Sequence, residues 1–224
     1  FSSIPPVENP APRPENLLIP KEGTRYLLIT DPEASQTIIS LIIIDSVPDR
    51  KARDLDYIRD GFVISLMNGM MGTRFSEIVQ KGTPPFIGGA LDYDSFYARN
   101  YNALTLASSV RKGEEAKGFE AALTELERAR RHGFAKGEIE RAKATMLANF
   151  ENLYKQKDKI SNDRWASNIT NNFLTGEPIP SLETQYDFYK EILPSITAEE
   201  VTNRLRELVA ENNRFILIQG PDDS

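Results

Sequence analysis

The most constraining feature of this sequence is a run of apolar, mostly β-branched residues, IISLIIID, at positions 38–45. β-Branched side chains favour extended backbone, and a short continuous apolar run is typical of a buried strand. Roughly 18 apolar residues are needed to span a bilayer, so this run is too short to cross a membrane. We therefore expect it to be a central strand of a sheet.

Strands and one long helical segment are predicted around this run. Residues 25–30 read as a second strand, and the turn-prone DPEAS between the two strands predicts a hairpin. Two more strands are predicted near 86–95 and 101–110. Between these pairs, from 49 to 81, apolar residues repeat on one helical face; they are Leu55, Ile58, Phe62, Leu66 and Met70.

Two amphipathic helices are predicted after the fourth strand. The first places Phe119 and Leu126 on one apolar stripe, and the second is longer, with its stripe running from Ile139 to Leu153. The only tryptophan in the sequence, Trp165, is expected to be buried in the second half of this long helix. Because both helices are amphipathic, we expect their apolar stripes to pack against the sheet.

The last predicted elements are a capped helix and a strand. Thr197 and Glu200 form an S/T-x-x-E capping box, and RFILIQG at 214–220 is a strand stopped by Pro221. The predicted order is β-β-α-β-β-α-α-α-α-β. Because strands occur in pairs and helices in runs, we predict an α+β fold, a two-layer sandwich whose mixed or antiparallel sheet carries helices packed on one face.

Composition divides the chain into two regions. Residues 1–20 hold six of the 14 prolines, and proline fixes φ and removes a backbone donor. This segment is expected to be an extended, proline-rich interdomain linker, followed by a single α+β domain at 21–224. Because the sequence begins at Phe1, without a methionine or a signal peptide, we expect it to be a fragment of a longer multidomain protein.

The composition also excludes several kinds of chemistry. The sequence has no cysteine and one histidine, which excludes disulfides, thiolate nucleophiles and cysteine ligands to zinc. The net charge is −6, and the basic residues in excess between 111 and 160 alternate with glutamates, as on a solvated helix. Binding of nucleic acid needs a coherent basic face, so we expect no nucleic-acid partner.

The stretch RHGFAKGEIERAK at 131–143 holds the single histidine, His132. Helical metal ligands need i,i+3 or i,i+4 spacing, whereas His132 lies six residues before Glu138, with Gly133 between them. Gly133 instead indicates the end of one helix, and the acidic residues of GEIE suit the first turn of the next. We therefore predict a joint between two helices, and neither a metal ligand nor a catalytic residue here.

Other candidate catalytic groups have simple interpretations. No G-x-S-x-G segment is present to expose a serine nucleophile. Acid/base catalysis needs two carboxyl groups held across a cleft, but the carboxylate pairs of this sequence lie where exposure to solvent is expected. These pairs are Asp54 and Asp56, Asp92 and Asp94, and Asp222 and Asp223.

Gly88 and Gly89 lie inside a predicted strand. Glycine weakens strand pairing and often marks a bulge or a close approach of two backbones. On an edge strand, a bare backbone of this kind can accept an extended peptide by β-augmentation. A bulge that serves only to curve the sheet explains the same two glycines, so the sequence leaves both interpretations open.

Several segments together resemble the pitrilysin/insulinase family of zinc metallopeptidases. The resemblance is to the family's non-catalytic, second-type domain, which pairs with each zinc-bearing domain, and it covers most of the chain. The runs R-x-x-x-H-G-F-x-x-x-E-I-E-R-A-K and T-P-P-F-I-G-G-A carry it most specifically, and they suit the bacterial branch. They lie within LMNGMMGTRFSEIVQKGTPPFIGGA, LERARRHGFAKGEIERAKATMLANFEN, FLTGEPIPSLETQYDFYKEILPSITAEEV and the closing QGP.

The resemblance implies repeated α+β domains whose two halves close around a peptide. Family members bind zinc through an inverted H-x-x-E-H motif in another domain, and this sequence lacks the motif. The resemblance thus implies no cofactor in this chain, zinc in the catalytic domain of the parent, and no hydrolysis by this chain alone. In some members a glycine-containing strand grips the substrate's N-terminal end, and the matching substrate-binding positions here are Gly88, Gly89 and Ala90.

We therefore expect a non-catalytic, chamber-forming and substrate-accommodating domain of a zinc metalloendopeptidase that degrades peptides. Its expected partners are the zinc-bearing domain of the same parent chain and a peptide substrate, with no nucleic acid and no membrane. A periplasmic or otherwise exported parent fits this reading. The alternative is a scaffold or protein-binding domain of an inactive peptidase homologue. An H-x-x-E-H motif upstream in the parent gene would support the peptidase, and its absence would support the scaffold.

Overall fold

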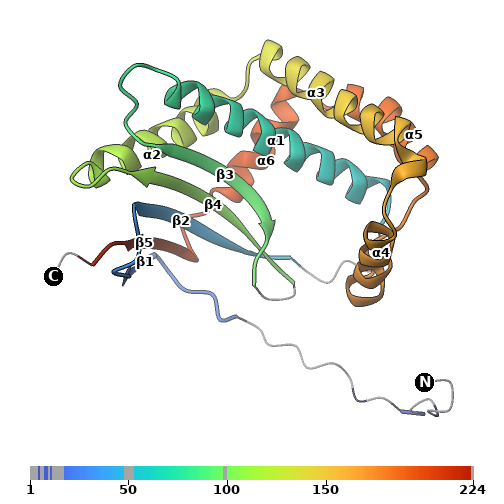
Figure 1. Cartoon of the computed structure of the whole chain (residues 1–224), viewed down its shortest axis with the longest axis horizontal. Coiled ribbons are helices and arrows are strands. Elements are labelled where there is room, and N and C mark those ends of the chain that lie inside the picture. Colours follow the sequence, from blue (N-terminus) through green and yellow to red (C-terminus); the bar gives the residue numbers. More distant parts are fainter. Residues whose placement is uncertain are drawn as a thin grey trace.

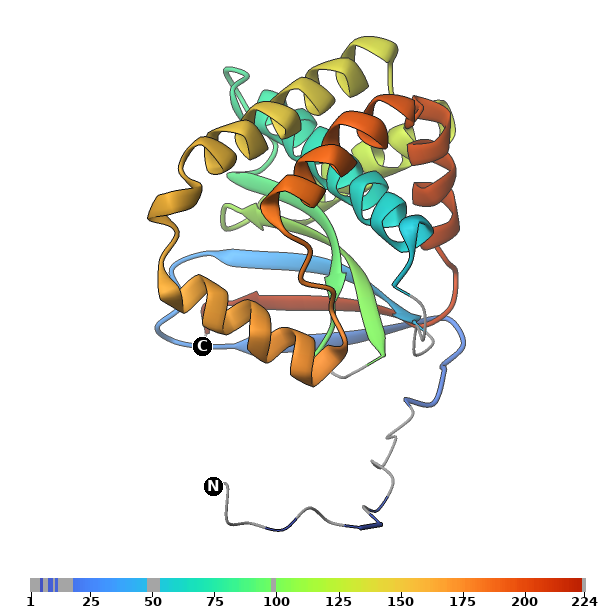
Figure 2. The ribbon, with the colours of Figure 1, turned by 90° about the vertical axis from the view of Figure 1, so that its right-hand side faces the viewer.

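The structure is a computed structural model with two layers, a five-stranded sheet and a set of helices that covers one face of it (Figures 1 and 2). The predicted α+β two-layer architecture is confirmed. Most of the predicted linker at 1–20 lies outside the residues that the structure describes, which are 5, 8, 9, 11, 18–47, 53–97 and 100–222.

The sheet has the strand order β1-β5-β2-β4-β3 and is mixed. β5 pairs parallel with β1 and antiparallel with β2, and all other pairs are antiparallel. The apolar run at 38–45 therefore lies in the central strand, as predicted. The strands are β1 (Thr24–Thr30), β2 (Thr37–Ser46), β3 (Gly88–Ser95), β4 (Tyr101–Val110) and β5 (Arg214–Gly220).

The predicted hairpin between the first two strands is wrong. The chain does turn after β1, where Ala34 N–H donates to Asp31 O at 3.0 Å, but β5 lies between β1 and β2. The turn signal is local, whereas the pairing with β5 joins residues that are far apart in the sequence. No local pattern distinguishes a hairpin from two strands with a third inserted between them.

The helices are α1 (Leu55–Val79), α2 (Glu115–His132), α3 (Lys136–Lys155), α4 (Asn162–Thr175), α5 (Leu182–Glu191) and α6 (Ala198–Leu208), with short 3₁₀ turns at Lys157–Lys159 and Leu193–Ser195. α4 lies beside the end of the sheet, apart from the main helix layer (Figures 1 and 2). Within the described parts of the chain, no helix is both long and apolar enough to cross a membrane.

The predicted burial of Trp165 in one long helix is wrong. α3 ends at Lys155, and Trp165 lies in α4, where it is 37% exposed. Five helices rather than four therefore follow β4 in the described chain. Residues 156–161 contain neither glycine nor proline, so no strong stop signal marks this break.

The core lies between the sheet and α1. Side chains alternate between the two faces of a strand, and the buried apolar residues of β2, Ile39, Leu41 and Ile43, belong to the core. The predicted apolar face of α1 belongs to the same core and packs mainly against β3, except that Leu55 at its first position is 62% exposed. Burying each such side chain stabilises the fold by roughly 1.5–3 kcal/mol.

Gly89 lets β3 come close to this helix layer. A Cβ atom at Gly89 would lie 2.7 Å from Cδ1 of Phe75 and 3.2 Å from Cε2 of Phe86, both of which are fully buried. At Gly88 a Cβ atom would meet nothing within 4 Å. Close packing therefore requires a glycine at position 89 but not at position 88.

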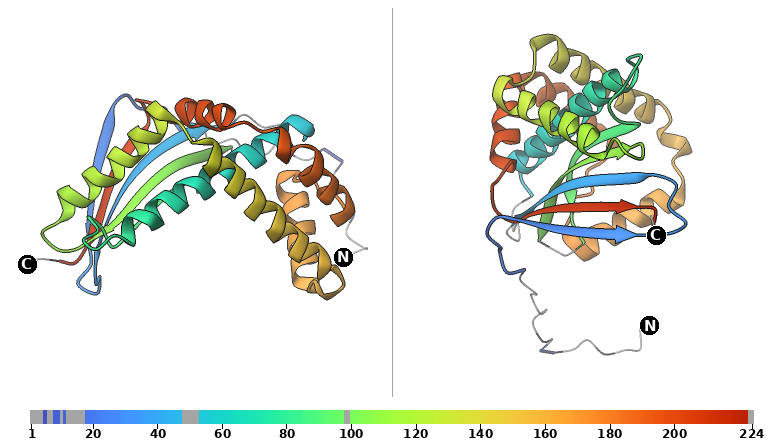
Figure 3. Two further views of the ribbon diagram at one scale, coloured as in Figure 1. Left: turned by 90° about the horizontal axis from the view of Figure 1, so that it is seen from above. Right: turned by 90° about the vertical axis from the view of Figure 1, so that its left-hand side faces the viewer.

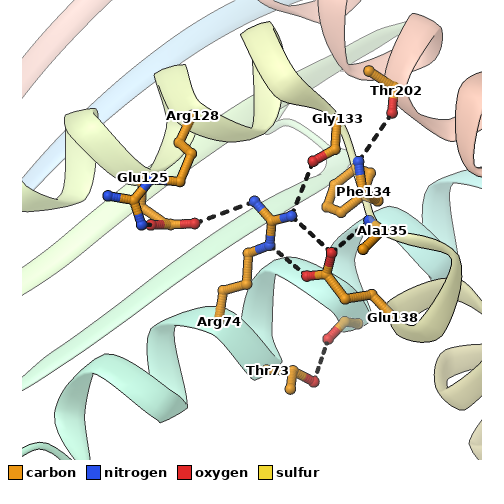
Figure 4. A network of polar contacts seen from close by, with 10 residues as sticks. Thr73, Arg74, Glu125, Arg128, Gly133, Phe134, Ala135, Glu138 and Thr202 are labelled. Atoms are coloured by element: carbon orange, nitrogen blue, oxygen red, sulfur yellow. Dashed lines mark hydrogen bonds and ion pairs between the residues drawn. The ribbon is translucent and has the colours of Figure 1, made fainter.

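Arg74 of α1 ties three helices together in the network of Figure 4. Its Nε and Nη2 atoms donate to the two carboxylate oxygens of Glu138 at 2.6 and 2.9 Å, and Nη1 donates to Glu125 at 3.2 Å. Nη2 also donates to the carbonyl oxygen of Gly133 at 2.9 Å. Most of the Arg74 side chain is buried, so bidentate pairing with Glu138 compensates its charge.

The stretch 131–143 is the predicted joint between two helices. α2 ends at His132, and Gly133 follows with a φ of 73°, which favours glycine. α3 begins at Lys136, and Glu138 in its first turn accepts a hydrogen bond from Ala135 N–H at 2.6 Å. The position of His132 is explained by the end of α2, and that of Glu138 by its hydrogen bonds to Arg74.

We expect the two neighbouring glycines of β3 to respond differently to the same change. Gly89→Ala places a methyl group against two buried rings and should lower the free energy of unfolding by about 1–3 kcal/mol. Gly88→Ala meets open space and restricts the unfolded chain, so its effect should stay within about 1 kcal/mol, in the stabilising direction. Chemical denaturation of both variants measures this, and equal losses would contradict the packing argument.

The free energy of unfolding at acid pH should depend on Glu138. The hydrogen bonds from Arg74 hold the pKa of Glu138 below its ordinary value. A carboxylate with a lowered folded-state pKa stabilises the fold above its unfolded pKa, and this contribution disappears as the pH falls through the lower, folded pKa. Glu138→Gln removes that titration and should make the acid limb of the stability curve shallower in denaturant titrations at a series of pH values.

Glu140→Gln is the matched control for this measurement. It removes the same charge from the same turn of α3, but Glu140 is largely exposed and its ion pair with Lys143 is long, at 3.8 Å. Exposed pairs of this kind contribute little. An acid limb that becomes equally shallow in both variants would show that the Arg74 network is not its source.

Candidate functional site

The candidate polar residues are dispersed over the described parts of the chain. No cluster of three or more potential ligands among histidine, aspartate and glutamate occurs there. His132 is exposed, and Asp54 caps α1 by accepting from Tyr57 N–H at 3.1 Å. Asp92 and Asp94 are exposed on β3, Asp222 is exposed near the end of β5, and Asp223 lies outside the described residues.

β3 forms one edge of the sheet, and it carries all three predicted substrate-binding positions. Within the described chain it pairs only with β4, with Gly88 opposite Ser109, Gly89 opposite Ser108 and Ala90 opposite Ala107. The edge strand on which the peptide-binding interpretation depends is therefore present. Binding of a peptide to these positions stays a prediction.

The start of β3 has the geometry of a β-bulge. Ile87 N–H donates to the carbonyl oxygen of Ser109 at 2.7 Å, although the strand partner of Ser109 is Gly88. Two residues of one strand thus lie opposite one residue of the other. The two glycines therefore have structural explanations of their own, a bulge at Gly88 and a close approach at Gly89, beside any role in binding.

The outer edge of β3 presents backbone groups in a regular pattern. In an antiparallel pair, the N–H and C=O groups of alternate residues point toward the partner strand and away from it. Tyr93 N–H donates to Oδ1 of Asn68 in α1 at 3.1 Å, so the backbone of Tyr93 points outward. By alternation, Gly89 and Leu91 also turn their backbone groups to the outer edge.

Tyr93 is held firmly at the far end of this edge. Its hydroxyl donates to Oδ2 of Asp45 at 2.7 Å, and the guanidinium of Arg204 lies 5.6 Å from its ring centre. Burial, with the hydrogen bond to Asp45, raises the pKa of Tyr93 to about 12. The phenol therefore stays protonated at neutral pH and keeps donating to Asp45.

The opposite edge of the sheet is an exposed apolar strand. β1 pairs only with β5 among the described strands, and its side chains from Tyr26 to Ile29 are between 43% and 75% exposed. These side chains point alternately to both faces of the sheet. An exposed apolar edge of this length is typical of a surface that another polypeptide covers.

α4 exposes apolar side chains. Ile169 and Phe173 lie one turn apart and are 61% and 86% exposed, whereas Trp165, which is 37% exposed, also lines a cavity of about 830 Å³ between α4 and the rest of the domain. The other α4 residues that line this cavity are polar. Surface helices normally bury their apolar stripe, so these exposed side chains also indicate a partner. The polar residues are Arg164, Asn168, Asn171 and Thr175.

The cavity between α4 and the rest of the domain is also lined by residues of α1, α5 and the end of β3. Side-chain contacts fasten α4 across it, since Arg53 donates to Thr175 O at 3.0 Å and the Tyr57 hydroxyl contacts both carboxylate oxygens of Glu177 at 2.6 and 2.7 Å. α4 is therefore fixed in this orientation. The sequence prediction extended one long helix to Trp165, so it identified neither α4 nor the exposed apolar residues Ile169 and Phe173.

No family model matches the sequence. A curated relative from Arabidopsis thaliana, named "Zinc protease PQQL-like", is 24% identical over 187 residues, which cover 84% of this chain and 16% of the relative. The chain thus spans a small part of that relative's length.

Solved structures share the fold. The first half of the periplasmic protease PqqL from Escherichia coli matches with a TM-score of 0.83 at 20% identity, over 93% of this chain and 45% of that one. The whole of that protease matches with a TM-score of 0.85 at 20% identity, over 96% and 24%. A peptidase M16 inactive domain from Pseudomonas fluorescens matches with a TM-score of 0.68 at 15% identity, over 97% and 48%.

These matches cover nearly all of this chain but less than half of each relative. That relation is the one expected for a single domain of a multidomain protein, and it agrees with the resemblance read from the sequence. The chain has the α+β fold of a domain from the M16 peptidases, the pitrilysin/insulinase group.

Proposed function

We propose that this chain is a non-catalytic, chamber-forming and substrate-accommodating domain of a zinc metalloendopeptidase that degrades peptides. The observation that carries the proposal is the outer edge at the start of β3, where Gly88, Gly89 and Ala90 are partly exposed, Gly89 turns its backbone groups away from the sheet, and no described strand but β4 pairs with them. An extended peptide can add to such an edge through main-chain hydrogen bonds. This mode needs little sequence specificity, which suits peptide degradation.

The partner of this domain, in this proposal, is the zinc-bearing domain of the same parent chain. The exposed β1 edge and the exposed Ile169 and Phe173 of α4 supply the contact surfaces. The chain spans 45% of the first half of PqqL, so a relative of that length has room for a further domain. Zinc belongs to that partner, because the sequence has a single histidine and lacks H-x-x-E-H.

A periplasmic or otherwise exported place for the parent is part of the same proposal. Its support is that the PqqL structures similar to this chain come from a protein described as periplasmic. Absence of cysteine is compatible with that compartment and with others. Fractionation of cells that express the full-length parent tests this point, and recovery of the parent in the cytosolic fraction would contradict it.

A scaffold or protein-binding domain of an inactive homologue is the second candidate. It is favoured by the similarity to a solved M16 domain named as inactive. In that case the same exposed edges hold a protein partner permanently rather than a substrate in transit. An H-x-x-E-H motif elsewhere in the parent supports the peptidase, and its absence supports the scaffold.

Peptides with a methylated backbone test the β3 edge directly. N-methylation of alternate residues removes either the N–H groups that face β3 or those that face solvent. One alternate set should weaken binding to the 224-residue chain by about tenfold or more, since several hydrogen bonds are lost. The other set should bind like the unmodified peptide in fluorescence anisotropy. Equal affinities for both sets would contradict addition to a strand edge.

The activity itself is expected only in the longer protein. The full-length parent should cleave unfolded peptides, and a chelator should abolish the cleavage, because zinc-bound water is the expected nucleophile. The purified 224-residue chain should be inactive with or without zinc. Cleavage by this chain that persists in a chelator would overturn the proposal.

A further inference from the structure

The cavity between α4 and the rest of the domain has two walls of different polarity. One wall is the polar side of α4, where Arg164, Asn168 and Asn171 recur at helical spacing. α4 lies beyond the end of the strands (Figures 1 and 3), so this side of the helix is not packed on the sheet. The α4 wall therefore offers mainly hydrogen-bonding groups to the cavity.

The other wall of the cavity is largely apolar. It comes from α1, α3 and α5, and its apolar residues stay partly exposed although they pack against the core. Contact with an apolar ligand would remove their remaining surface from water, which is favourable. These residues are Ile58, Ile64, Met146, Phe188 and Tyr189.

The carboxamides of the α4 wall are available to a ligand. No hydrogen bond within the described part of the chain involves the side chain of Asn168 or Asn171. By contrast, the side chain of Asn172, which does not line the cavity, donates to the carbonyl oxygen of Glu177 at 2.7 Å. A carboxamide has the donor and the acceptor that a peptide unit needs. Two of them, one turn apart, can bond two peptide units of an extended chain.

Most charged groups of the cavity wall have partners in the domain. Arg53 pairs with Glu177 at 3.9 Å, and Asp60 pairs with Arg204 at 3.1 Å. These pairs compensate the charge of the side chains concerned. The cavity therefore does not favour an occupant of high net charge.

Arg164 is the cation of this wall without an ion pair among the described residues. It is exposed in the first turn of α4, where the positive end of the helix dipole also attracts anions. Asp94, at the end of β3, is an anion of the same cavity, and it accepts from Ser95 N–H at 2.6 Å. A carboxylate on an occupant is therefore favoured near Arg164 and disfavoured near Asp94.

We propose that this cavity binds an extended polypeptide segment that has apolar side chains and a carboxylate near one end. Asn168 and Asn171 bond its backbone, its apolar side chains lie on the other wall, and Arg164 pairs with the carboxylate. The polar side of α4 from Arg164 to Thr175 is about 16 Å long, the length of about five extended residues. The choice of a polypeptide as occupant rests on the proposed function, but the site is separate from the start of β3.

Trp165 reports binding in this cavity, because it lines the cavity and is the only tryptophan of the sequence. Blocked five-residue peptides of leucine and serine, with glutamate at the first or the last position, are titrated into the 224-residue chain. Binding should move the emission of Trp165 to shorter wavelength and lower its quenching by acrylamide about twofold, since the ring is 37% exposed without a ligand. A peptide bound only at the start of β3 should change neither signal.

Substitutions in α4 test which groups hold the peptide. Asn168→Ala combined with Asn171→Ala removes both carboxamides and should weaken binding by about tenfold. Asn162→Ala is the matched control, because Asn162 belongs to the same helix, is exposed and does not line the cavity. This control should bind the peptides like the wild type.

Arg164→Gln separates the charge from the position of α4. The wild type should bind a peptide with glutamate at the favoured end about threefold more tightly than one with glutamine there, as for an exposed ion pair. Arg164→Gln should lose this preference and keep its affinity for the glutamine peptide. A displaced α4 would instead weaken the binding of both peptides equally, and circular dichroism shows whether each variant is folded.

The other outcomes would overturn the inference. If anisotropy shows binding while Trp165 emission is unchanged, the peptide binds elsewhere, and the proposed function of the β3 edge stands. If Trp165 responds but the asparagine pair can be removed without loss, these side chains do not hold the backbone. If peptides with serine in place of every leucine bind equally well, the apolar wall is not used. If neither these peptides nor those of the N-methylation test bind, both the cavity site and the proposed function are wrong.

Discussion

An open sheet leaves two strands with unpaired backbone groups, and the treatment of these two edges decides how this domain can act. Backbone groups that find no partner cost free energy when they are buried and attract other strands when they are exposed. At the β3 edge, the Asn68 carboxamide satisfies the backbone of Tyr93, Leu91 is buried, and only Gly88, Gly89 and Ala90 near the start of the strand are partly exposed. At the β1 edge, exposed apolar side chains leave the surface suited to permanent cover by a neighbouring domain.

The helix layer that covers β3 is joined by a polar network. Arg74 joins α1 to the ends of α2 and α3 through Glu138, Glu125 and Gly133, and a buried charge paired on several sides is costly to separate. α1 in turn fixes both ends of the β3 edge, with Phe75 at Gly89 and Asn68 at Tyr93. The polar network of Arg74 and the contacts to β3 are thus joined through α1.

Sequence patterns predicted most of the fold, and they failed where the decisive contact is distant in the chain. The central strand at 38–45, the helix joint at Gly133 and the strand that contains Gly88 and Gly89 follow from local apolar runs and capping. The pairing of β1 with β5 and the break before α4 do not. Trp165 was expected to be buried in one long helix, because no glycine or proline marks the break at 156–161.

The candidate site was predicted only in part for the same reason. Glycine marked the strand, but the residue that bonds its outer edge, Asn68, is 25 positions from Tyr93. An asparagine in a helix gives no local sign that it bonds a strand. The close approach at Gly89 likewise depends on Phe75 and Phe86, whose rings are ordinary core residues by sequence pattern.

The inserted position of β5 has a consequence for synthesis on the ribosome. β1 has no other partner among the described strands, and its register places Thr24 opposite Arg214, which is translated 190 residues later. At about 5–20 residues per second, that interval is about 10–40 s. During this time the apolar β1 segment is an unpaired part of the nascent chain, exposed to chaperones and to neighbouring nascent chains alike.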